Sequence, residues 1–377
     1  MARVLFVPPA TPAPDRNGLA MRAGVTVDGV AQRHELDVAV VRFPGVGASL
    51  DWVRSRCHEV IDVTLDSDRV PMRSWVDTER GRRVVAAPLP ELARYRPPSF
   101  GARIIEQLGS AFDVVIVMGT YNAGLAIPFL EAGVPALLDA FDDDASTCAS
   151  LATIDATQRD QVPLYETFQR EVFPWFERVL FASMDDAGTP ERYLPNAVRI
   201  PESWGTRPRA DPLELLYIGD PGYVPNADAL DRLRRSIVPA IEAVVPSVRL
   251  LHPDRAKSVD PYYDQAHLAV VPLRAGGGTR IKILEAFARG CPVVATPTAA
   301  AGLDVAHDVH LVVTDDDDDD SGFARAVIEL AADEPRRHRL ATSARAFVCE
   351  HHDARSVGER LATLVDEVVD AHPIRGG

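Results

Sequence analysis

The stretch RAGGGTRIKILEAFARGCPVVATP, residues 274 to 297, decides the fold of the second half of the chain. Three consecutive glycines lead into Thr-Arg-Ile-Lys, and an isolated glutamate follows inside an apolar pattern of helical spacing. The run before it, HLAVVPL (267–273), and the run PVVAT (292–296) inside it both have the composition of buried strands. The stretch therefore predicts a strand, a glycine loop, a helix and a second strand, in that order.

This order of elements is suited to holding a phosphate group. Glycines let backbone N–H groups approach an anion, and the helix start adds free N–H donors. Arg280 and Lys282 add full charges at the same end. Glu285 lies about 9 Å beyond Thr279 along the helix axis, and its carboxylate could accept hydrogen bonds from both ribose hydroxyls. A nucleoside diphosphate fits this spacing; the alternative is a glycine turn followed by an exposed Lys282–Glu285 ion pair.

Strand-like runs alternate with amphipathic runs along the chain, which predicts parallel sheets covered by helices on both faces. The strand-like runs of the first half are 3–8, 35–41, 113–118, 134–139 and 178–183. Those of the second half are 213–219, 247–251, 267–273, 292–296 and 310–314. The rhythm restarts after the polar, proline-bearing stretch 201–212. We therefore predict an α/β protein with two doubly wound domains, over residues 1–200 and 201–350.

Residues 351–377 are expected to form a C-terminal helix that could pack on either domain, including the N-terminal one. Ligands of doubly wound sheets bind beyond the carboxyl ends of the strands. Two such domains in series therefore predict a ligand site in a cleft between them. Six aspartates, 315–320, precede a helical pattern, where negative charge favours a helix N-terminus. A metal site there is disfavoured because consecutive side chains do not converge on one point.

Composition excludes several classes of protein. A chain of 377 residues is too long for one hydrophobic core and is long enough for two domains of ordinary size. A formal net charge of -15 argues against a general nucleic-acid binder, which needs surplus lysine and arginine. No apolar run approaches the roughly 18 residues of a membrane helix, and no targeting segment is visible, so we expect a cytoplasmic protein. The four cysteines contain no CxxC and indicate neither a zinc site nor a disulfide framework.

The run VPLRAGGGTRIKILEAFARGCPVVATP, followed by AAAGLDV, strongly resembles the carboxyl half of GT-B glycosyltransferases of family GT4. LLYIGDPGYVPNADAL (215–230) and YLPNAVRIP (193–201) resemble the segments that open this half. The amino half resembles the family more loosely, through RVLFVPPATPAPDRNGLAMR and VPALLDAFDDDAS. The resemblance implies two Rossmann-like domains, with the acceptor on the first and a nucleotide-sugar donor on the second. It implies hexosyl transfer with retention of configuration, and neither a metal nor another cofactor.

Carried over by position, the resemblance gives a donor site. Glu285 matches the second glutamate of the family's E-x7-E motif, which binds the donor ribose. The donor-phosphate loop corresponds to Gly276, Gly277, Gly278, Thr279, Arg280 and Lys282. Arg280, Lys282 and the backbone N–H groups of Gly278 and Thr279 would stabilise the leaving diphosphate. Gly18, in the loop after the first strand, either approaches the same phosphates or is an ordinary turn glycine.

The sequence departs from the family pattern at three places. Gly277 stands where the first glutamate of E-x7-E would fall, so the donor sugar must be contacted by other groups. The arginine and lysine that many members place after the first strand of this half are absent from GDPGYVPN, which leaves Arg280 and Lys282 as the cations. No histidine stands at Met118 to Tyr121, where many members have one. The sequence therefore assigns no general base.

The acceptor side is predicted from LLDAFDDDAS, which follows a strand of the first half. Tyr121, Asp142 and Asp143 are the candidates. A negative field from Asp139 and Asp142 to Asp144 could attract a cationic acceptor such as an amino sugar, in place of a neutral small molecule or glycan. The alternative is that Asp142 to Asp144 cap a helix. A metal on these aspartates is disfavoured by the two-domain rhythm.

Two other functions stay open on this sequence. Gly277 and the missing histidine would also suit a non-catalytic glycan-binding or partner subunit on the same fold. A sugar-nucleotide epimerase is a third possibility. His252 and His267, which flank strands, are expected to be structural.

Overall fold

The computed structural model describes residues 1–43, 49–65, 73–206, 208, 210–245, 247–253 and 258–372. The chain divides into two compact units. Unit 1 comprises Met1–Ala149, Thr157–Pro195 and Arg355–Gly377, and unit 2 comprises Ser150–Ala156 and Asn196–Ala354. Residues 207 and 209 of the polar stretch, and 373–377 of the C-terminal segment, lie outside the described residues.

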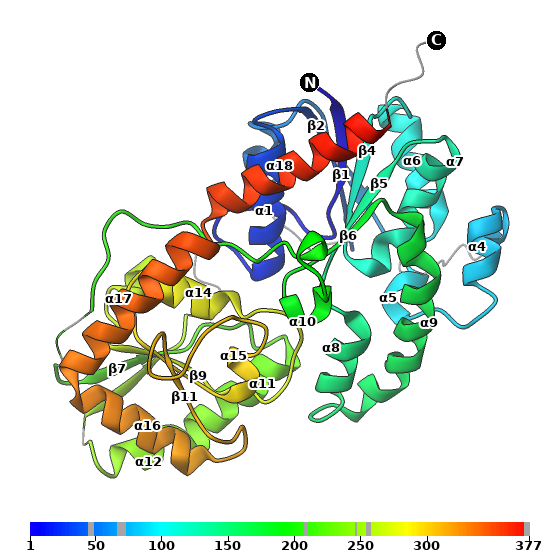
Figure 1. The fold of residues 1–377 in the computed structure, drawn as a ribbon. Coiled ribbons are helices and arrows are strands. Elements are labelled where there is room, and N and C mark those ends of the chain that lie inside the picture. The colour runs from blue at the N-terminus through cyan, green and yellow to red at the C-terminus, as the bar shows by residue number, and fades with distance from the viewer. Residues whose placement is uncertain are drawn as a thin grey trace. The chain divides into compact units, whose positions relative to one another are not determined.

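Unit 1 contains a six-stranded parallel sheet in the order β3-β2-β1-β4-β5-β6 (Figure 1). Its strands are β1 (Arg3–Val7), β2 (Glu35–Arg42), β3 (Val60–Thr64), β4 (Val114–Met118), β5 (Ala136–Phe141) and β6 (Arg178–Phe181). The strand order reverses direction between β1 and β4, which makes this the doubly wound sheet that the sequence predicts. The predicted strand-like runs missed β3, in which only Val63 is fully buried.

Helices lie on the faces of this sheet and fill the connections between its strands. The α-helices are α1 (Gly18–Val30), α2 (Asp51–Arg54), α3 (Arg73–Val76), α4 (Glu79–Val84), α5 (Glu91–Arg94), α6 (Pro98–Leu108), α7 (Ile127–Glu131), α8 (Asp144–Leu151), α9 (Val162–Val172), α10 (Met184–Ala187) and α18 (Ala354–Ala371). Short 3-10 helices are η1 (Thr120–Ala126), η2 (Ala156–Gln161), η3 (Phe173–Trp175) and η4 (Pro190–Arg192).

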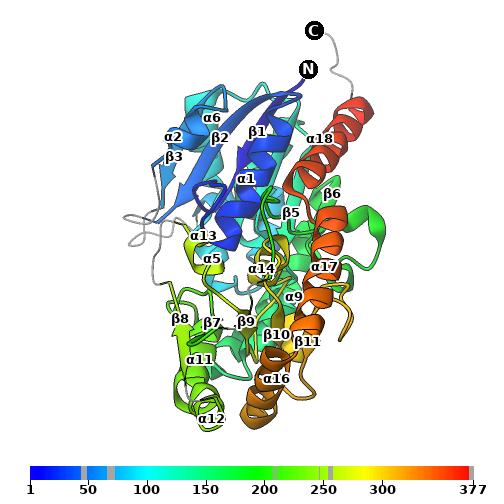
Figure 2. The same cartoon turned by 90° about the vertical axis from the view of Figure 1, so that its left-hand side faces the viewer.

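The core of unit 1 forms where helices cover the sheet. Every residue of β4, VVIVM, is buried, as its apolar β-branched composition requires for a central parallel strand. Trp75 and Phe129 are fully buried in the same cluster. On α1, Gly29 meets Gly358 of α18 so closely that a Cβ atom on Gly29 would lie 2.4 Å from the Gly358 carbonyl oxygen. The C-terminal helix α18 thus packs directly on α1 (Figure 2).

Unit 2 contains a five-stranded parallel sheet in the order β11-β10-β9-β7-β8. Its strands are β7 (Leu213–Leu216), β8 (Val248–Leu251), β9 (Leu268–Val271), β10 (Val293–Ala295) and β11 (Val312–Val313). Its helices are α11 (Val224–Arg232), the π-helix η5 (Leu233–Ile237), α12 (Val238–Glu242), α13 (Asp260–Tyr263), α14 (Ile281–Ala288), α15 (Pro297–Ala300), α16 (Asp320–Ala332) and α17 (Glu334–His351). The strand order reverses between β7 and β9, so the predicted second doubly wound sheet is also confirmed.

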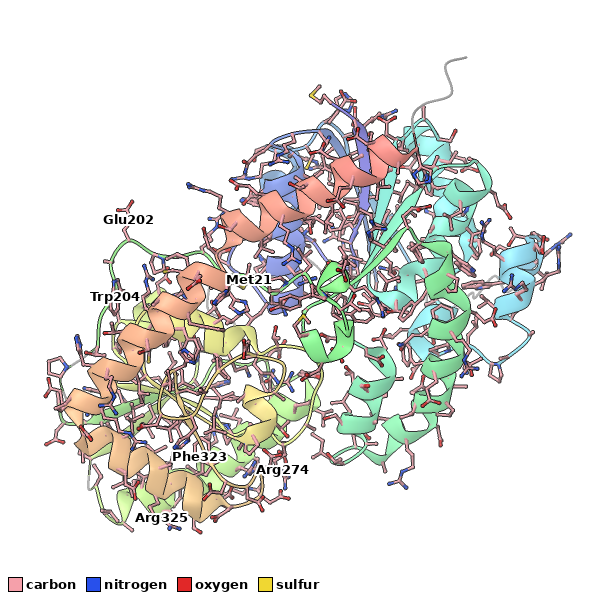
Figure 3. The ribbon with its side chains drawn as sticks, in the orientation of Figure 1. Met21, Glu202, Trp204, Arg274, Phe323 and Arg325 are labelled. Atoms are coloured by element: carbon pink, nitrogen blue, oxygen red, sulfur yellow. The ribbon has the colours of Figure 1, made fainter. Side chains whose placement is uncertain are left out.

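Helix α16 shows how the amphipathic pattern is used in unit 2. Phe323 lies fully buried on the inner face of the helix, whereas Arg325 points to solvent (Figure 3).

No helix among the described residues combines the length and the apolar character needed to span a bilayer.

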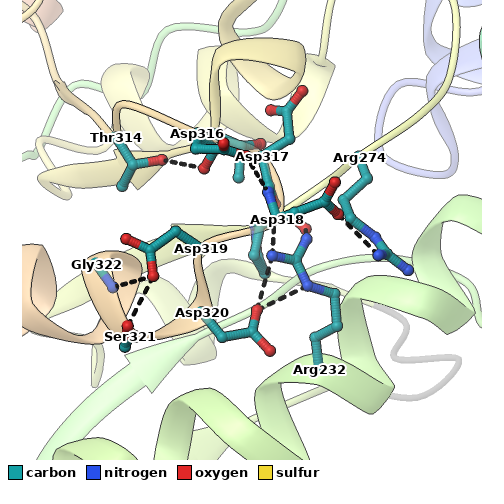
Figure 4. Close-up of polar contacts among 12 residues, drawn as sticks. Arg232, Arg274, Thr314, Asp316, Asp317, Asp318, Asp319, Asp320, Ser321 and Gly322 are labelled. Carbon is teal, nitrogen blue, oxygen red and sulfur yellow. Dashed lines mark hydrogen bonds and ion pairs between the residues drawn. The ribbon is translucent and has the colours of Figure 1, made fainter.

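The aspartate run 315–320 ends at the first residue of α16 and does more than cap this helix (Figure 4). Asp319 accepts a hydrogen bond from the Gly322 N–H at 2.9 Å, which is the predicted capping role. Asp318 and Asp320 form ion pairs with Arg274 and Arg232 at 2.8 and 2.7 Å. The run therefore also ties the start of α16 to arginines from α11 and from the loop after β9. Across the described residues, no group of three or more His, Cys, Asp or Glu side chains is placed to hold a metal ion.

Candidate functional site

The residues that follow β7 and β9 meet at the point where the strand order of unit 2 reverses. Open α/β sheets usually bind ligands at this point, beyond the carboxyl ends of the strands. Here the segment after β9 contains the three glycines, and α14 begins at Ile281, two residues later than the predicted start. Gly276 and Gly278 adopt φ angles of 129° and 57°, which residues with a side chain rarely adopt. The glycines are therefore needed for this backbone path.

The glycine loop is held partly by its own arginine. The Arg280 guanidinium donates hydrogen bonds to the carbonyl oxygens of Gly277 and Gly278. It also donates to the Thr298 carbonyl oxygen at 3.3 Å. The Thr279 hydroxyl accepts a hydrogen bond from the Asn196 side-chain amide at 2.8 Å. Arg280, predicted as a catalytic cation, thus also fixes the curvature of the loop.

Lys282, on the first turn of α14, has neutral partners. Its amine donates to Asn226 Oδ1 at 2.7 Å and to the Tyr217 hydroxyl at 3.4 Å, and it lies 4.6 Å from the centre of the Tyr217 ring. Burial, and secondly the charge of Arg280, lower the pKa of Lys282 to about 7. No carboxylate within the described part of the chain forms an ion pair with this amine. The site therefore contains a cation that lacks a fixed counter-charge.

The partners of Lys282 were not predicted from sequence. Tyr217 directly follows β7, and its ring stacks on His252 with 5.9 Å between ring centres. Asn226, at the start of α11, donates from its amide nitrogen to the Asp220 carbonyl oxygen at 3.0 Å. His252 lies 2.9 Å from the Gly219 carbonyl oxygen and supports Tyr217 from below, consistent with the structural role expected of it. The sequence feature that could have indicated these partners is the position of Tyr217 near the end of a predicted strand and of Asn226 after it, at the carboxyl edge of the sheet.

Glu285 lies one turn further along α14 and is 8% exposed. Its carboxylate lies 3.8 Å from the Arg289 guanidinium, which is also bound to Asp260 at 2.7 Å. Burial raises the pKa of Glu285 to about 7, and Arg289 opposes the shift. Lys282 and Glu285 are neither fully exposed nor paired with each other within the described contacts. The alternative of an exposed ion pair on this helix is therefore wrong.

The remaining predicted site residues belong to unit 1. Gly18 is the first residue of α1, whose cap is Asn17; the Asn17 side chain accepts from the Ala20 N–H at 3.0 Å. Tyr121 lies in η1 after β4, and the Arg96 guanidinium lies 4.7 Å from the centre of its ring. Arg96 is 5% exposed, so Tyr121 covers a buried cation. The structure groups Gly276 to Glu285 in unit 2, and Gly18, Tyr121, Asp142 and Asp143 in unit 1.

The aspartates near the end of β5 have different environments. Asp139 forms a buried ion pair with Arg22, with 2.7 Å between Oδ1 and Nη2. Asp143 accepts from the Ser146 N–H at 2.9 Å and from the Gln169 amide at 3.2 Å, so it caps α8. Burial and the charge of Asp142 raise the pKa of Asp144 to about 8. Asp139 is thus neutralised by Arg22, and the raised pKa of Asp144 favours its uncharged form.

Comparisons with known proteins bear on residues 200–333 and on the fold of the chain. Residues 200–333 match the family model described as glycosyl transferases group 1. No protein of curated function matches the chain in sequence.

Three solved structures illustrate the likeness in fold. Sucrose-phosphate synthase from Thermosynechococcus elongatus is 14% identical with a TM-score of 0.71, and the match covers 98% of this chain and 100% of that one. HepE from Anabaena, in complex with UDP and glucose, is 15% identical with a TM-score of 0.63, covering 97% and 100%. An alpha,alpha-trehalose-phosphate synthase (UDP-forming) from Burkholderia xenovorans, in complex with glucose-6-phosphate, is 13% identical with a TM-score of 0.60, also covering 97% and 100%.

At this level of identity, the solved structures show the fold alone. The family model adds a match to residues 200–333, which lie in unit 2. The glycine loop, Lys282 and Glu285 all lie inside the matched segment. Residues 200–333 therefore resemble glycosyl transferases group 1, and the chain has the GT-B fold of the solved structures that it resembles.

Proposed function

We propose that the protein is a retaining, GT4-type glycosyltransferase that moves a hexose from a nucleotide sugar to an acceptor without a metal ion. The observation that carries the proposal is Lys282, a partly buried amine beside a glycine loop and a helix start, whose hydrogen-bond partners among the described residues are neutral. A buried cation without a counter-charge is costly unless a ligand supplies the anion. A diphosphate supplies that anion at the position where doubly wound sheets usually bind ligands.

Each predicted donor residue has a role in this proposal. The backbone N–H groups of Gly278 and Thr279, with the start of α14, face the diphosphate, and Lys282 adds positive charge. Arg280 keeps the loop in its curved path through the carbonyls of Gly277 and Gly278. Gly276 allows the loop to turn, and Gly18 of unit 1 is proposed to approach the same phosphates. Glu285 accepts hydrogen bonds from the ribose hydroxyls.

The proposed chemistry depends on charge that moves during the reaction. Breaking the anomeric bond leaves positive charge on the sugar and negative charge on the diphosphate, so groups fixed around the diphosphate stabilise the transition state. Lys282→Ala or Arg280→Ala should therefore lower kcat more than it raises the KM for the donor. Weaker binding at an unchanged kcat would place both residues in ground-state recognition.

The acceptor is proposed to bind unit 1 near Tyr121, Asp142 and Asp143. A cationic acceptor such as an amino sugar would be attracted by the two aspartates, and this attraction is screened over about 8 Å at physiological salt. The acceptor KM should therefore rise with sodium chloride, and Asp142→Asn should flatten that dependence. A neutral preferred acceptor, or an unchanged salt dependence, would contradict the acceptor role of these aspartates.

Release of nucleoside diphosphate tests the main proposal. Because the HepE structure is described with UDP and glucose, UDP-glucose is the first donor to try, followed by other nucleotide hexoses. Slow release of the nucleoside diphosphate by wild type, lost in Lys282→Ala, supports an enzyme. EDTA should leave this activity intact, and loss that manganese or magnesium restores would overturn the metal-free mechanism.

A non-catalytic partner or glycan-binding subunit is the second candidate, favoured by Gly277 at the position of the first family glutamate. No release across the donor panel, together with a glycan that raises Tm, would support that function in place of catalysis.

A further inference from the structure

A chain of buried hydrogen bonds links the start of unit 2 with the glycine loop and with the end of α17. Asn196 is the first residue of unit 2 after Pro195. Its side-chain amide donates to the Thr279 hydroxyl at 2.8 Å, and its carbonyl oxygen lies 2.7 Å from His352 Nδ1. Asn196 and Thr279 are each 7% exposed and His352 is 1% exposed. The three residues are far apart in sequence, so this contact is a product of the fold.

The backbone around the chain of hydrogen bonds is also paired. The Val198 N–H donates to the His352 carbonyl oxygen at 2.9 Å, and the Ala354 N–H donates to the Val198 carbonyl oxygen at 3.0 Å. The segments 196–198 and 352–354 thus run side by side where the chain enters and leaves unit 2. A carbonyl oxygen can only accept, so His352 Nδ1 donates the hydrogen bond. Burial lowers the pKa of His352, which keeps the ring neutral with its proton on this nitrogen.

Thr279 is well placed to transmit this anchoring to the glycine loop. It directly precedes Arg280, the cap residue of α14, and directly follows Gly278 with its φ of 57°. Glycines offer no side chain by which the loop could be held. The hydrogen bonds from Arg280 to Gly277 and Gly278 shape the loop internally but do not attach it to residue 196. The Ser150 hydroxyl accepts from the Gly276 N–H at 3.0 Å at the first glycine, and the Asn196 amide supplies the attachment at the helix end of the loop.

We propose that Asn196 is a positioning residue for the donor loop: it holds the Thr279 hydroxyl so that the N–H groups of Gly278, Thr279 and the α14 start face the diphosphate. The inference rests on the proposed donor site. Asn196 itself touches neither sugar nor phosphate in this scheme. His352 acts one step further away by fixing the Asn196 backbone.

Hydrogen–deuterium exchange on the ligand-free protein tests the positioning without any ligand. Asn196→Ala and Thr279→Val each remove one partner of the hydrogen bond, and both should speed exchange of the amides between residues 276 and 282. Thr342→Val is the matched control, because Thr342 is exposed on α17 and its hydroxyl donates only within that helix, to the His338 carbonyl oxygen at 2.9 Å. Exchange in the loop should equal wild type in this control. Unchanged loop exchange in both test variants overturns the proposal.

Calorimetry with UDP as the probe gives the second measurement. Each single variant should bind UDP about fivefold more weakly, the effect of one hydrogen bond of typical net strength. Thr279→Ser keeps the hydroxyl and should lose less affinity than Thr279→Val. In Asn196→Ala/Thr279→Val the two losses should not add, because both remove the same bond. Additive losses, or equal losses in the Ser and Val variants, overturn the proposal.

The two measurements separate this proposal from the donor site on which it rests. If wild type binds no nucleoside diphosphate while the Asn196 variant speeds loop exchange, the donor function fails and the anchoring stands. If wild type binds UDP and the Asn196 variant binds equally well with unchanged exchange, the donor site stands and the positioning role fails. His352→Asn, which can place an N–H near the position of Nδ1, should lose less affinity than His352→Phe.

Discussion

The carboxyl edges of the two sheets differ in whether their buried charged side chains are paired with each other. In the carboxyl-terminal half of β5 of unit 1, Asp139 and Arg22 neutralise each other through two hydrogen bonds of 2.8 and 2.7 Å. In unit 2, Lys282 contacts an amide and a phenol, and Glu285 lies 3.8 Å from an arginine that is shared with Asp260. Both edges follow parallel strands of doubly wound sheets. Among the described residues, Asp139 and Arg22 compensate each other fully, whereas Lys282 has neutral partners and Glu285 shares its arginine with Asp260.

This contrast distinguishes a structural ion pair from a binding site. Loss of one partner of a buried ion pair with good geometry destabilises the protein strongly. While the pair is intact, however, its charges are already neutralised and bind a ligand only weakly. A buried amine or carboxyl with incomplete partners has a shifted pKa and gains the most from a ligand of opposite charge or of matching hydrogen-bond donors. Lys282 and Glu285 both have a pKa of about 7 for this reason.

Breaking the paired edge should give the largest effect. Arg22→Ala leaves the Asp139 carboxylate buried without its cation, and we expect a loss of about 3–5 kcal/mol in the free energy of unfolding. Urea denaturation measures it. Arg33→Ala is the control, because the Arg33–Asp366 pair is exposed on both sides and such pairs contribute about 0–1 kcal/mol. Equal losses in the two variants would show that the Arg22 pair is not special.

Glu285→Ala should instead affect binding. Removing the ribose acceptor should raise the donor dissociation constant about tenfold, or about 1.4 kcal/mol. The fold should stay intact, because a buried carboxyl with a raised pKa opposes folding once pH exceeds its unfolded value. Calorimetry with a nucleoside diphosphate measures the affinity, and Glu285→Gln, which keeps one acceptor oxygen, should lose less. An unchanged affinity in the alanine variant would contradict the ribose role.

The pH dependence of binding sharpens the comparison further. The pKa of Lys282 lies near 7, well below its unfolded value, so the amine loses its charge as pH rises through 7. The affinity for UDP should therefore fall between pH 7 and 9, by at most about tenfold per pH unit. Lys282→Arg keeps its charge across this range and should remove the fall. If wild type and Lys282→Arg have parallel profiles, another group is responsible.

Substitution of Asp144 should give the smallest change in stability. Asp144 differs from Asp139 in unit 1 because its pKa is raised by burial. Its folded-state pKa of about 8 lies above the unfolded value, so its contribution to stability is full at low pH and is lost as pH rises through 8. Asp144→Asn should therefore melt at a higher temperature than wild type at pH 8.5, with a smaller gain at about pH 5.5. Paired thermal melts measure the difference, and the exposed Asp160→Asn is the control. A gain that does not grow with pH would contradict burial as the cause.

The sequence predicted the fold well where strands are buried on both faces. β4 and most of β1 appear as continuous apolar runs, because parallel strands covered by helices on both faces carry few polar residues. β3 was not predicted from the sequence, because it lies at the edge of the sheet beside β2 and its Asp62 and Thr64 are exposed. Residues 61–65, Ile-Asp-Val-Thr-Leu, alternate between apolar and polar side chains, but they lack the continuous apolar run by which the other strands of this sheet were recognised.

The candidate site was predicted where its residues are close in sequence. The glycine loop, Lys282 and Glu285 follow one another within a single strand-loop-helix segment. Tyr217 and Asn226 meet Lys282 only because β7 and β9 are neighbours in the sheet, which spacing along the chain does not reveal. The contacts of Arg280 with its own loop depend on the glycine φ angles. The Arg22 pair, which removes Asp139 from the acidic cluster, likewise needs the fold.

Helix α18 determines how the protein can be divided experimentally. Its buried residues Val357, Leu361 and Val365 belong to unit 1, although the helix follows the whole of unit 2 in sequence. Ending translation after Pro195 would leave α1 with an uncovered apolar strip around Gly29, a surface that invites aggregation. A soluble form of unit 1 alone would need residues 355–372 joined to residue 195 by a linker, as when an inserted domain is excised from its host.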